Sequence, residues 1–465
     1  MGDWYLVCIT LAAIVVIILG VSVLKLHPFL SLIIASLFLG IFAGLPLDKL
    51  VSSYETGVGS LLSDLAGIIG LGTILGKMMA DSGGGLQIAN ALTRKFGESK
   101  LHWAMMFSGF IIGLPVFFEV GVVLLLPLVI SISKNSKKSI LFVGLPLIAG
   151  LSIVHGIVPP HPGAMTAIGI YKANVGKSLL YGLIVAIPSA IVAGPLFGKW
   201  VSKRVKPSFS PYGESNETAV NTGFNETAST KDSMAVKSGG HLSEHIPSFT
   251  AALITILLPI LLMLLSMVIE YLPLNHAIIN FAKFIGTPVI ALLISVFVAY
   301  FSLGFHKKVN KGKVTALIEE CLKPLAAIML IMGAGGGFKQ VLVDSGVGTA
   351  FGHISQNLSL SPIVLAFIIA GLIRVATGSA TVALTTAAGI VAPVAEHMTG
   401  VNKELLVIAT GAGSLMLSHV NDSGFWLVKQ YLGLSVKETF KTWTVLETLL
   451  SVTAFVCVLI LNIFI

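Results

Sequence analysis

The sequence predicts an all-α polytopic membrane protein. We expect an inverted repeat of two units, each with about five transmembrane helices and one re-entrant hairpin, with discontinuous helices at the membrane midplane. The chain of 465 residues is 55% hydrophobic and only 11% charged, whereas a soluble domain carries about 25% charged residues. Apolar stretches long enough to cross a bilayer recur from Trp4 to the last residue. Short patterns of the first half also return in the second half, which indicates an internal repeat.

The repeated patterns keep their order along the chain. The pairs are Asp81-Ser82-Gly83 with Asp344-Ser345-Gly346, Gly113 with Gly371, His155 with His419, and Tyr171 and Lys177 with Tyr431 and Lys437. We interpret the two Asp-Ser-Gly segments as turns that end helices. An internal repeat in a polytopic membrane protein is typical of secondary transporters, whose site lies where the two halves meet.

Twelve apolar blocks are expected, six in each half of the chain. They span about 4–24, 28–45, 60–80, 102–133, 139–170 and 178–202, and then 249–271, 277–304, 321–343, 361–395, 403–430 and 441–465. The domains are therefore a first repeat over 1–205, a second, inverted repeat over 248–465, and a linker over 206–247 that is rich in Ser, Thr, Asn and Gly.

Two blocks are too long for one simple crossing. Block 102–133 is interrupted at Gly113-Leu114-Pro115, and block 361–395 is interrupted between Arg374 and Thr381 by small and hydroxyl residues. Backbone at membrane depth leaves the helix only where protein or water satisfies its polar groups. We interpret both blocks as re-entrant hairpins whose tips meet near the midplane; the alternative is a long, tilted or kinked span.

The distribution of charge sets the expected orientation. If the hairpins do not cross, most basic loop residues fall on one side: 25–27, 94–100, 134–138, 199–206, the linker, 306–313 and 429–441. The other side holds Asp3, Asp48, Lys49, Glu55, Lys172, Asp344, Glu396, Lys403 and Glu404. The positive-inside rule then places the linker in the cytoplasm and both termini outside. Each half then crosses the membrane five times. Because five is odd, the second half is inserted upside down relative to the first.

The positive-inside rule also explains the net charge of +8, so no nucleic-acid partner is expected.

The fifth block of each half contains polar residues and helix breakers. The first reads Val154-His155-Gly156-Ile157-Val158-Pro159-Pro160-His161, and the second reads Ser418-His419-Val420-Asn421-Asp422-Ser423-Gly424. Adjacent prolines bar a continuous helix, and ionisable groups at membrane depth usually line a pathway. We therefore expect two broken helices whose half-helix N-termini suit a carboxylate.

Four ionisable groups are candidate proton carriers. Glu119 follows the first hairpin break, and burial in an apolar setting penalises its charge; the alternative is a salt bridge, for which Arg374 is a candidate partner. His155 and His419 could relay protons, since free imidazole titrates near neutral pH, or they could have packing roles. Asp422 lies beside His419 in the second broken helix.

The substrate-binding candidates surround the second hairpin tip. Arg374 offers a planar, two-pronged donor set to a carboxylate; alternatively it ties the hairpin to a neighbouring helix. The hydroxyls and backbone of Thr377, Gly378, Ser379 and Thr381 could meet substrate hydroxyls. Asn421, His161 and Glu119 complete the predicted substrate-binding set. The glycines of Gly333 to Gly337 are interpreted as a close helix-packing surface.

No motif for a cofactor is present. Gly176-Lys177-Ser178 ends like a phosphate loop, but Tyr171 stands where its first glycine belongs, and no zinc-protease motif occurs. We expect no cofactor and no metal, and transport driven by an ion gradient or by the substrate gradient alone.

At four segments the chain resembles the gluconate:proton symporter family of bacterial permeases. They are Gly113-Leu114-Pro115-Val116-Phe117-Phe118-Glu119-Val120-Gly121, Val158-Pro159-Pro160-His161-Pro162-Gly163, Arg374-Val375-Ala376-Thr377-Gly378-Ser379-Ala380-Thr381 and Ser418-His419-Val420-Asn421-Asp422-Ser423-Gly424-Phe425-Trp426. The resemblance covers nearly the whole chain apart from the linker.

The resemblance implies import of gluconate or a related sugar acid with protons across the bacterial inner membrane. It also implies that a hairpin-bearing domain moves against a fixed scaffold. Blocks 1 and 2 and residues 249–304 would supply the scaffold and the contacts of a possible homodimer. The alternatives are a permease for another small hydroxy acid or D-serine, an intramembrane enzyme that uses the His/Asn/Asp cluster, or a passive channel.

Overall fold

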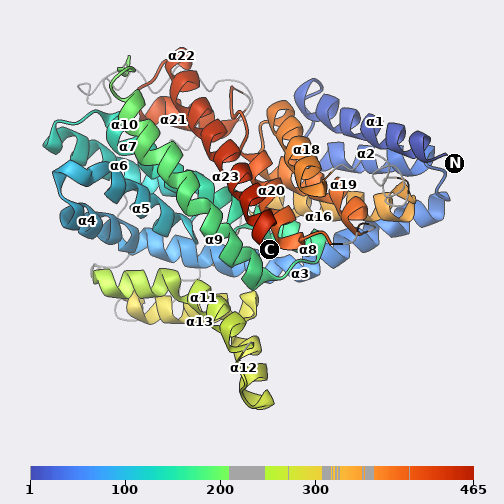
Figure 1. Cartoon of the computed structure of the whole chain (residues 1–465), viewed down its shortest axis with the longest axis horizontal. Helices are drawn as coiled ribbons and strands as arrows, with labels where there is room; N and C mark the ends of the chain where they lie inside the picture. Colours follow the sequence, from blue (N-terminus) through green and yellow to red (C-terminus); the bar gives the residue numbers. More distant parts are fainter. Residues whose placement is uncertain are drawn as a thin grey trace.

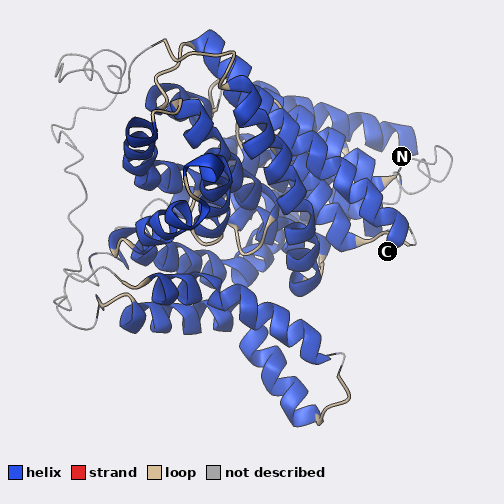
Figure 2. Ribbon diagram, turned by 60° about the vertical axis from the view of Figure 1, so that its left-hand side comes forward, coloured by secondary structure: helices blue, strands red, loops and turns tan. Residues whose placement is uncertain are grey.

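The structure is a computed structural model that describes residues 2–208, 247–270, 272–305, 325–347, 361–396, 400–420 and 422–465, together with positions 316, 318, 319, 322, 350 and 398. These residues form helices and connecting loops and contain no strand (Figure 2). Part of the predicted linker, residues 209–246, and the basic loop 306–313 lie outside the described residues.

Apart from the helix over Gly84–Phe96, which lies between two predicted blocks, the helices of the first half follow the predicted apolar blocks. They are α1 (Asp3–Ser22), α2 (Pro28–Phe42), α3 (Leu47–Asp81), α4 (Gly84–Phe96), the 3₁₀ turn η1 (Glu98–Lys100), α5 (Leu101–Gly113), α6 (Phe118–Ser136), α7 (Ile140–Ile157), α8 (Pro162–Tyr171), α9 (Val175–Ile191), the π-helical η2 (Val192–Leu196) and α10 (Phe197–Val201).

The described helices of the second half repeat much of this order. They are α11 (Phe249–Glu270), α12 (His276–Gly286), α13 (Pro288–Ser302), α16 (Leu325–Asp344), α18 (Pro362–Thr377), α19 (Ala380–Glu396), α20 (Lys403–Ser414), α21 (Ser423–Tyr431), α22 (Val436–Thr439), the π-helical η3 (Phe440–Thr444) and α23 (Val445–Phe464). Within the described ranges, seven helices are long and apolar enough to cross a membrane, or nine if two bent pairs each count as one span.

Helix breaks occur in all four blocks where the sequence predicts them. They separate α5 from α6 at 114–117, α7 from α8 at 158–161, α18 from α19 at 378–379, and α20 from α21 at 415–422. The third break spans fewer residues than the predicted interruption from Arg374 to Thr381, because Arg374 is still helical in the last turn of α18. Gly378 ends that helix in the left-handed conformation, at φ 73°, which glycine adopts without steric strain.

The two predicted hairpins differ in their packing. α18 and α19 lie against each other, whereas α5 packs along α7 and makes little contact with α6. α18 and α19 contain 16 and 17 residues, fewer than the ~20 that span a bilayer. These lengths fit a hairpin that enters the membrane without crossing it, and the re-entrant arrangement remains a prediction.

Two segments depart from the predicted blocks. Block 277–304 forms two helices, α12 and α13, that are bent by 69°. Pro288 is the first residue of α13 and Thr287 is extended, because the proline ring disfavours helical backbone in the residue before it. In addition, α3 extends 35 residues from Leu47, well before the predicted start near 60, because no proline interrupts the polar segment.

The order of the elements is similar in the two halves of the chain. α3 and α16 both end in Asp-Ser-Gly, with Gly83 at φ 74° and Gly346 at φ 73°, which confirms these segments as helix ends. Each half then has two broken helix pairs and closes on a helix with a π-helical segment, η2 or η3. The inversion of one half relative to the other remains a prediction.

Glycines allow the two halves to approach closely. A Cβ on Gly57 of α3 would lie 2.3 Å from the carbonyl oxygen of Gly336 in α16, and a Cβ on Gly336 would lie 2.6 Å from that of Gly57. This contact confirms Gly333 to Gly337 as a packing surface. On one side of the bundle, α11 and α13 lie together, and α12 packs against α11 and extends from the bundle (Figure 1); none of the residues of α12 is buried.

Candidate functional site

The helix breaks meet around a cavity of about 130 Å³. Its walls come from the starts of α6, α19 and α21, the ends of α7, α18 and α20, and the η3–α23 helix. The lining residues are Phe118, Glu119, Ser152, His155, Arg374, Gly378, Ser379, Ala380, Thr381, Leu415, Asp422, Ser423, Gly424, Trp443 and Glu447. Segments from both halves of the chain therefore build one polar cavity, which we call the central cavity.

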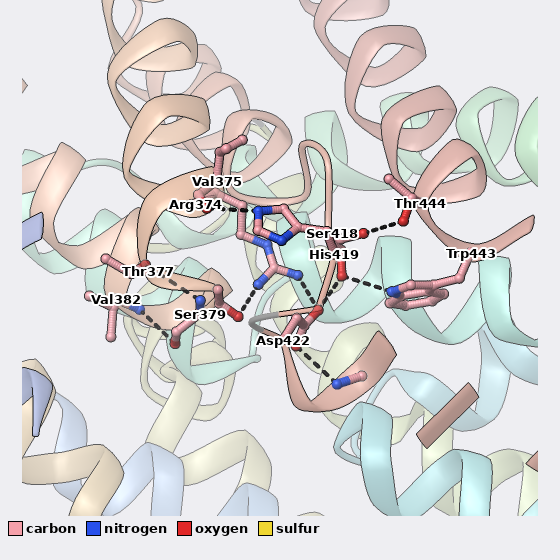
Figure 3. A network of polar contacts seen from close by, with 12 residues as sticks. Arg374, Val375, Thr377, Ser379, Val382, Ser418, His419, Asp422, Trp443 and Thr444 are labelled. Carbon is pink, nitrogen blue, oxygen red and sulfur yellow. Dashed lines mark hydrogen bonds and ion pairs between the residues drawn. The ribbon is translucent and has the colours of Figure 1, made fainter. Parts of the chain in front are cut away.

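Arg374 and Asp422 form a buried ion pair in the wall of this cavity (Figure 3). Arg374 is 4% exposed, and its Nη2 lies 2.5 Å from Oδ2 of Asp422. Its Nη1 donates to the carbonyl oxygen of Gly378, while its Nε has no hydrogen-bond partner among the described residues. Arg374 thus ties the end of α18 to the start of α21 and keeps one donor unused beside the cavity.

Asp422 connects this ion pair to two further elements. Its carboxylate accepts hydrogen bonds from the hydroxyl of Ser418 and, at 2.9 Å, from the backbone N–H of Gly424, so it caps α21. Ser418 Oγ in turn accepts from Nε1 of Trp443 at 2.7 Å, and its carbonyl oxygen accepts from Thr444 Oγ1 at 2.6 Å. The network fixes the position of the arginine relative to η3, the segment that leads into α23 (Figure 3).

Three helices begin at the central cavity. α6 starts with Phe118, α19 with Ala380 and α21 with Ser423, and all three residues line the cavity. The first N–H groups of a helix lack intrahelical acceptors and carry partial positive charge. With Arg374, these helix ends give the cavity the character of an anion site.

The predicted histidines occupy three different environments. His155 lines the central cavity, and its ring packs edge-on against that of His161, with centroids 4.9 Å apart. His161 lies behind this wall, where its Nε2 donates to the carbonyl oxygen of Gly113 at 2.5 Å. His419 Nε2 donates to the carbonyl oxygen of Val375 at 3.0 Å and does not line the cavity.

The structure gathers part of the predicted site in the cavity. The predicted residues that line it are Glu119, His155, Arg374, Gly378, Ser379, Thr381 and Asp422. His161, Thr377 and His419 do not line it. The Thr377 hydroxyl donates to the carbonyl oxygen of Ile373 at 2.8 Å. Asn421 lies outside the described residues.

Several lining residues are absent from the predicted set. Glu447 is 1% exposed, and Trp443, one turn earlier, packs against Phe118 with ring centroids 5.3 Å apart. A carboxyl inside the apolar block 441–465 is itself a signal, because charge at membrane depth is rare and usually functional. Ser152 gives no comparable signal, since serines are common in membrane helices.

Glu119 also faces a second cavity of about 350 Å³. This side cavity is lined by Thr73, Gly76, Lys77, Pro115, Val116, Phe117, Glu119, Val120, Leu325 and Ile328. Glu119 therefore stands between the two spaces. Within the described ranges, no group of three or more His, Cys, Asp or Glu side chains is placed to hold a metal ion.

Comparison with known proteins decides the family. The family model of the GntP family permeases matches residues 4–464. The chain belongs to this family. It is 49% identical to a gluconate permease of Pseudomonas aeruginosa, covering 99% of this chain and 98% of that protein. It is 41% identical to the high-affinity gluconate transporter of Escherichia coli, in an alignment that covers 98% of this chain and 99% of that protein. It is 39% identical to a D-serine transporter of the same organism, in an alignment that covers 97% of this chain and 96% of that protein.

A solved structure shares the fold of this permease. The YdaH transporter of Alcanivorax borkumensis, described as having an unusual topology, superposes with a TM-score of 0.64 over 94% of this chain and 98% of that one, at 15% identity. The family and the apolar helices together identify a multi-pass membrane permease and not an enzyme. The predicted family and the all-helical fold class are thereby confirmed.

Proposed function

We propose that this permease imports gluconate or a related sugar acid together with protons across the bacterial inner membrane. The observation that carries the proposal is the central cavity, where Arg374 and three helix starts surround a space lined by hydroxyl groups. The relatives named as gluconate permeases support the substrate class.

The cavity offers distinct contacts to the two ends of a sugar acid. The substrate carboxylate would lie near the free Nε of Arg374 and the first N–H groups of α19 and α21, where positive charge is concentrated. Its hydroxyls would exchange hydrogen bonds with Ser379 and Thr381. A substrate lacking the carboxylate would leave the Nε donor of Arg374 without an acceptor, so the cavity favours acids.

Glu119 is the proposed proton carrier. It lines both the central and the side cavity, so its carboxyl has access to two spaces in one conformation. Protonation would remove a negative charge from the cavity as the anion enters. Movement of the α18–α19 hairpin against the scaffold would then expose the site alternately to the two sides of the membrane, with α1, α2 and α11–α13 in the scaffold and in a homodimer contact.

Uptake of labelled gluconate into proteoliposomes tests this function. We expect accumulation when the outside is made acidic, loss of accumulation with an uncoupler, and competition by other sugar acids. Gluconate that equilibrates without responding to the proton gradient would refute symport and indicate a passive channel. Accumulation of D-serine in place of gluconate would reassign the substrate to the class of the Escherichia coli relative.

A further inference from the structure

Glu447 presents a buried carboxyl to the central cavity, in addition to the exposed Glu119. It lies in the first turn of α23, is 1% exposed and lines the cavity. Its Oε1 has no hydrogen-bond partner among the described residues. An ionised carboxylate buried away from water is strongly destabilised unless it is paired and hydrogen-bonded.

The guanidinium of Arg374 already has an ionic partner in the cavity. Arg374 is paired with Asp422 at 2.5 Å, and within the described ranges no ion pair joins Glu119 or Glu447 to a basic side chain. His155, on the same wall, packs its ring against that of His161, and no ion pair joins it to either glutamate among the described residues. The helices α9 and α20, which also pack against α23, carry their ionisable groups in their first two turns: Lys177, Tyr181, Lys403 and Glu404.

This charge distribution constrains how an anion can enter. The charges of Arg374 and Asp422 neutralise each other. If Glu119 and Glu447 were both ionised, the substrate carboxylate would be a third negative charge in the same cavity. Like charges repel more strongly in a partly buried cavity than in water, because the effective dielectric constant there is lower. The anion therefore binds best when both glutamates carry protons.

We propose that Glu447 is a second proton-binding group of the transport cavity, so that two protons accompany each monocarboxylate. This inference rests on the proposed sugar-acid symport. Two protons and one anion carry one net positive charge inward in each cycle, so transport is driven by the membrane potential as well as by the pH gradient.

The full-length permease in proteoliposomes tests this stoichiometry. With equal pH on both sides, an inside-negative potential of about 59 mV imposed with potassium and valinomycin should raise gluconate accumulation tenfold, since a tenfold ratio corresponds to 59 mV for one net charge. With the potential clamped at zero, one pH unit should give about hundredfold accumulation, a factor of ten for each proton.

Glu447→Gln isolates the second proton. The variant should still accumulate about tenfold per pH unit through the remaining carboxyl, but it should no longer respond to the potential. Combined with Glu119→Gln, it should lose accumulation and keep gluconate exchange. Glu55→Gln, at an exposed glutamate of α3 remote from both cavities, should behave like the unmodified protein.

Each result decides between alternatives. Accumulation by the unmodified protein that ignores the potential would overturn the two-proton inference while leaving symport intact. A Glu447→Gln variant that keeps the hundredfold ratio would exclude Glu447 as the second group. If that variant fails to exchange gluconate, the ratio measured on the unmodified protein still decides the stoichiometry. Absence of any gluconate uptake would refute the proposed function, and this inference with it.

Discussion

Replacing Asp422 with Asn tests whether Arg374 is held for a substrate anion. Asn has nearly the shape of Asp and is an equally favourable N-cap, so the hydrogen bond from Gly424 N–H is expected to persist. The change removes the negative charge that lies 2.5 Å from Arg374, a side chain only 4% exposed. The variant therefore leaves a buried guanidinium without its counter-charge.

The expected cost is large because the pair is buried. Removing one partner of a buried ion pair costs about 3–5 kcal/mol, most of it from the charge left unpaired. Asp81→Asn provides the matched control. Asp81 lies 3.2 Å from Lys77 in an i,i+4 pair whose side chains are 20% and 27% exposed, and i,i+4 helical pairs contribute about 0.3–0.5 kcal/mol.

Chemical unfolding in mixed micelles, with and without gluconate, measures both effects. Without substrate, Asp422→Asn should lose about 3–5 kcal/mol, and the control should lose no more than about 0.5 kcal/mol. Saturating gluconate should restore much of the loss, because its carboxylate replaces the missing charge beside Arg374. A loss below about 1 kcal/mol, or one that gluconate leaves unchanged, would refute the assignment of Arg374 as the anion-binding group.

Three further variants test separate parts of the structure. Glu119→Gln should lower the gluconate accumulation that a pH gradient supports and spare gluconate exchange; unchanged accumulation in proteoliposomes would exclude it as a carrier. Arg374→Lys should raise the half-saturation concentration at least tenfold, since one ammonium cannot replace the fork that reaches both Asp422 and Gly378; unaltered uptake kinetics would make its role structural. Gly336→Leu should destabilise the α3–α16 contact by about 1–3 kcal/mol, measured as the thermal unfolding midpoint in detergent, and a midpoint equal to that of the unmodified protein would contradict the close packing.

The helix breaks were predictable because their causes are local. Pro115 and the pair Pro159-Pro160 lack the N–H donor that a continuous helix needs, and Gly378 adopts a left-handed backbone that other residues avoid. The sequence therefore determined where the apolar blocks are interrupted. By the same local reasoning it identified the two Asp-Ser-Gly segments as helix ends.

The composition of the central cavity depended on tertiary packing. Arg374 and Asp422 are 48 residues apart. Nothing in the local sequence shows that Arg374 pairs with Asp422 and not with Glu119. Glu447 reaches the same space only because α23 packs beside α7 and α20. His161 and His419 lie near the cavity but hydrogen-bond to the backbone of Gly113 and Val375.

The sequence by itself determined the membrane class and the four breaks, because hydropathy and backbone conformation are properties of short segments. Only the tertiary structure decided which charges are paired and which face the cavity, because a buried group takes its partner from whichever helix lies beside it.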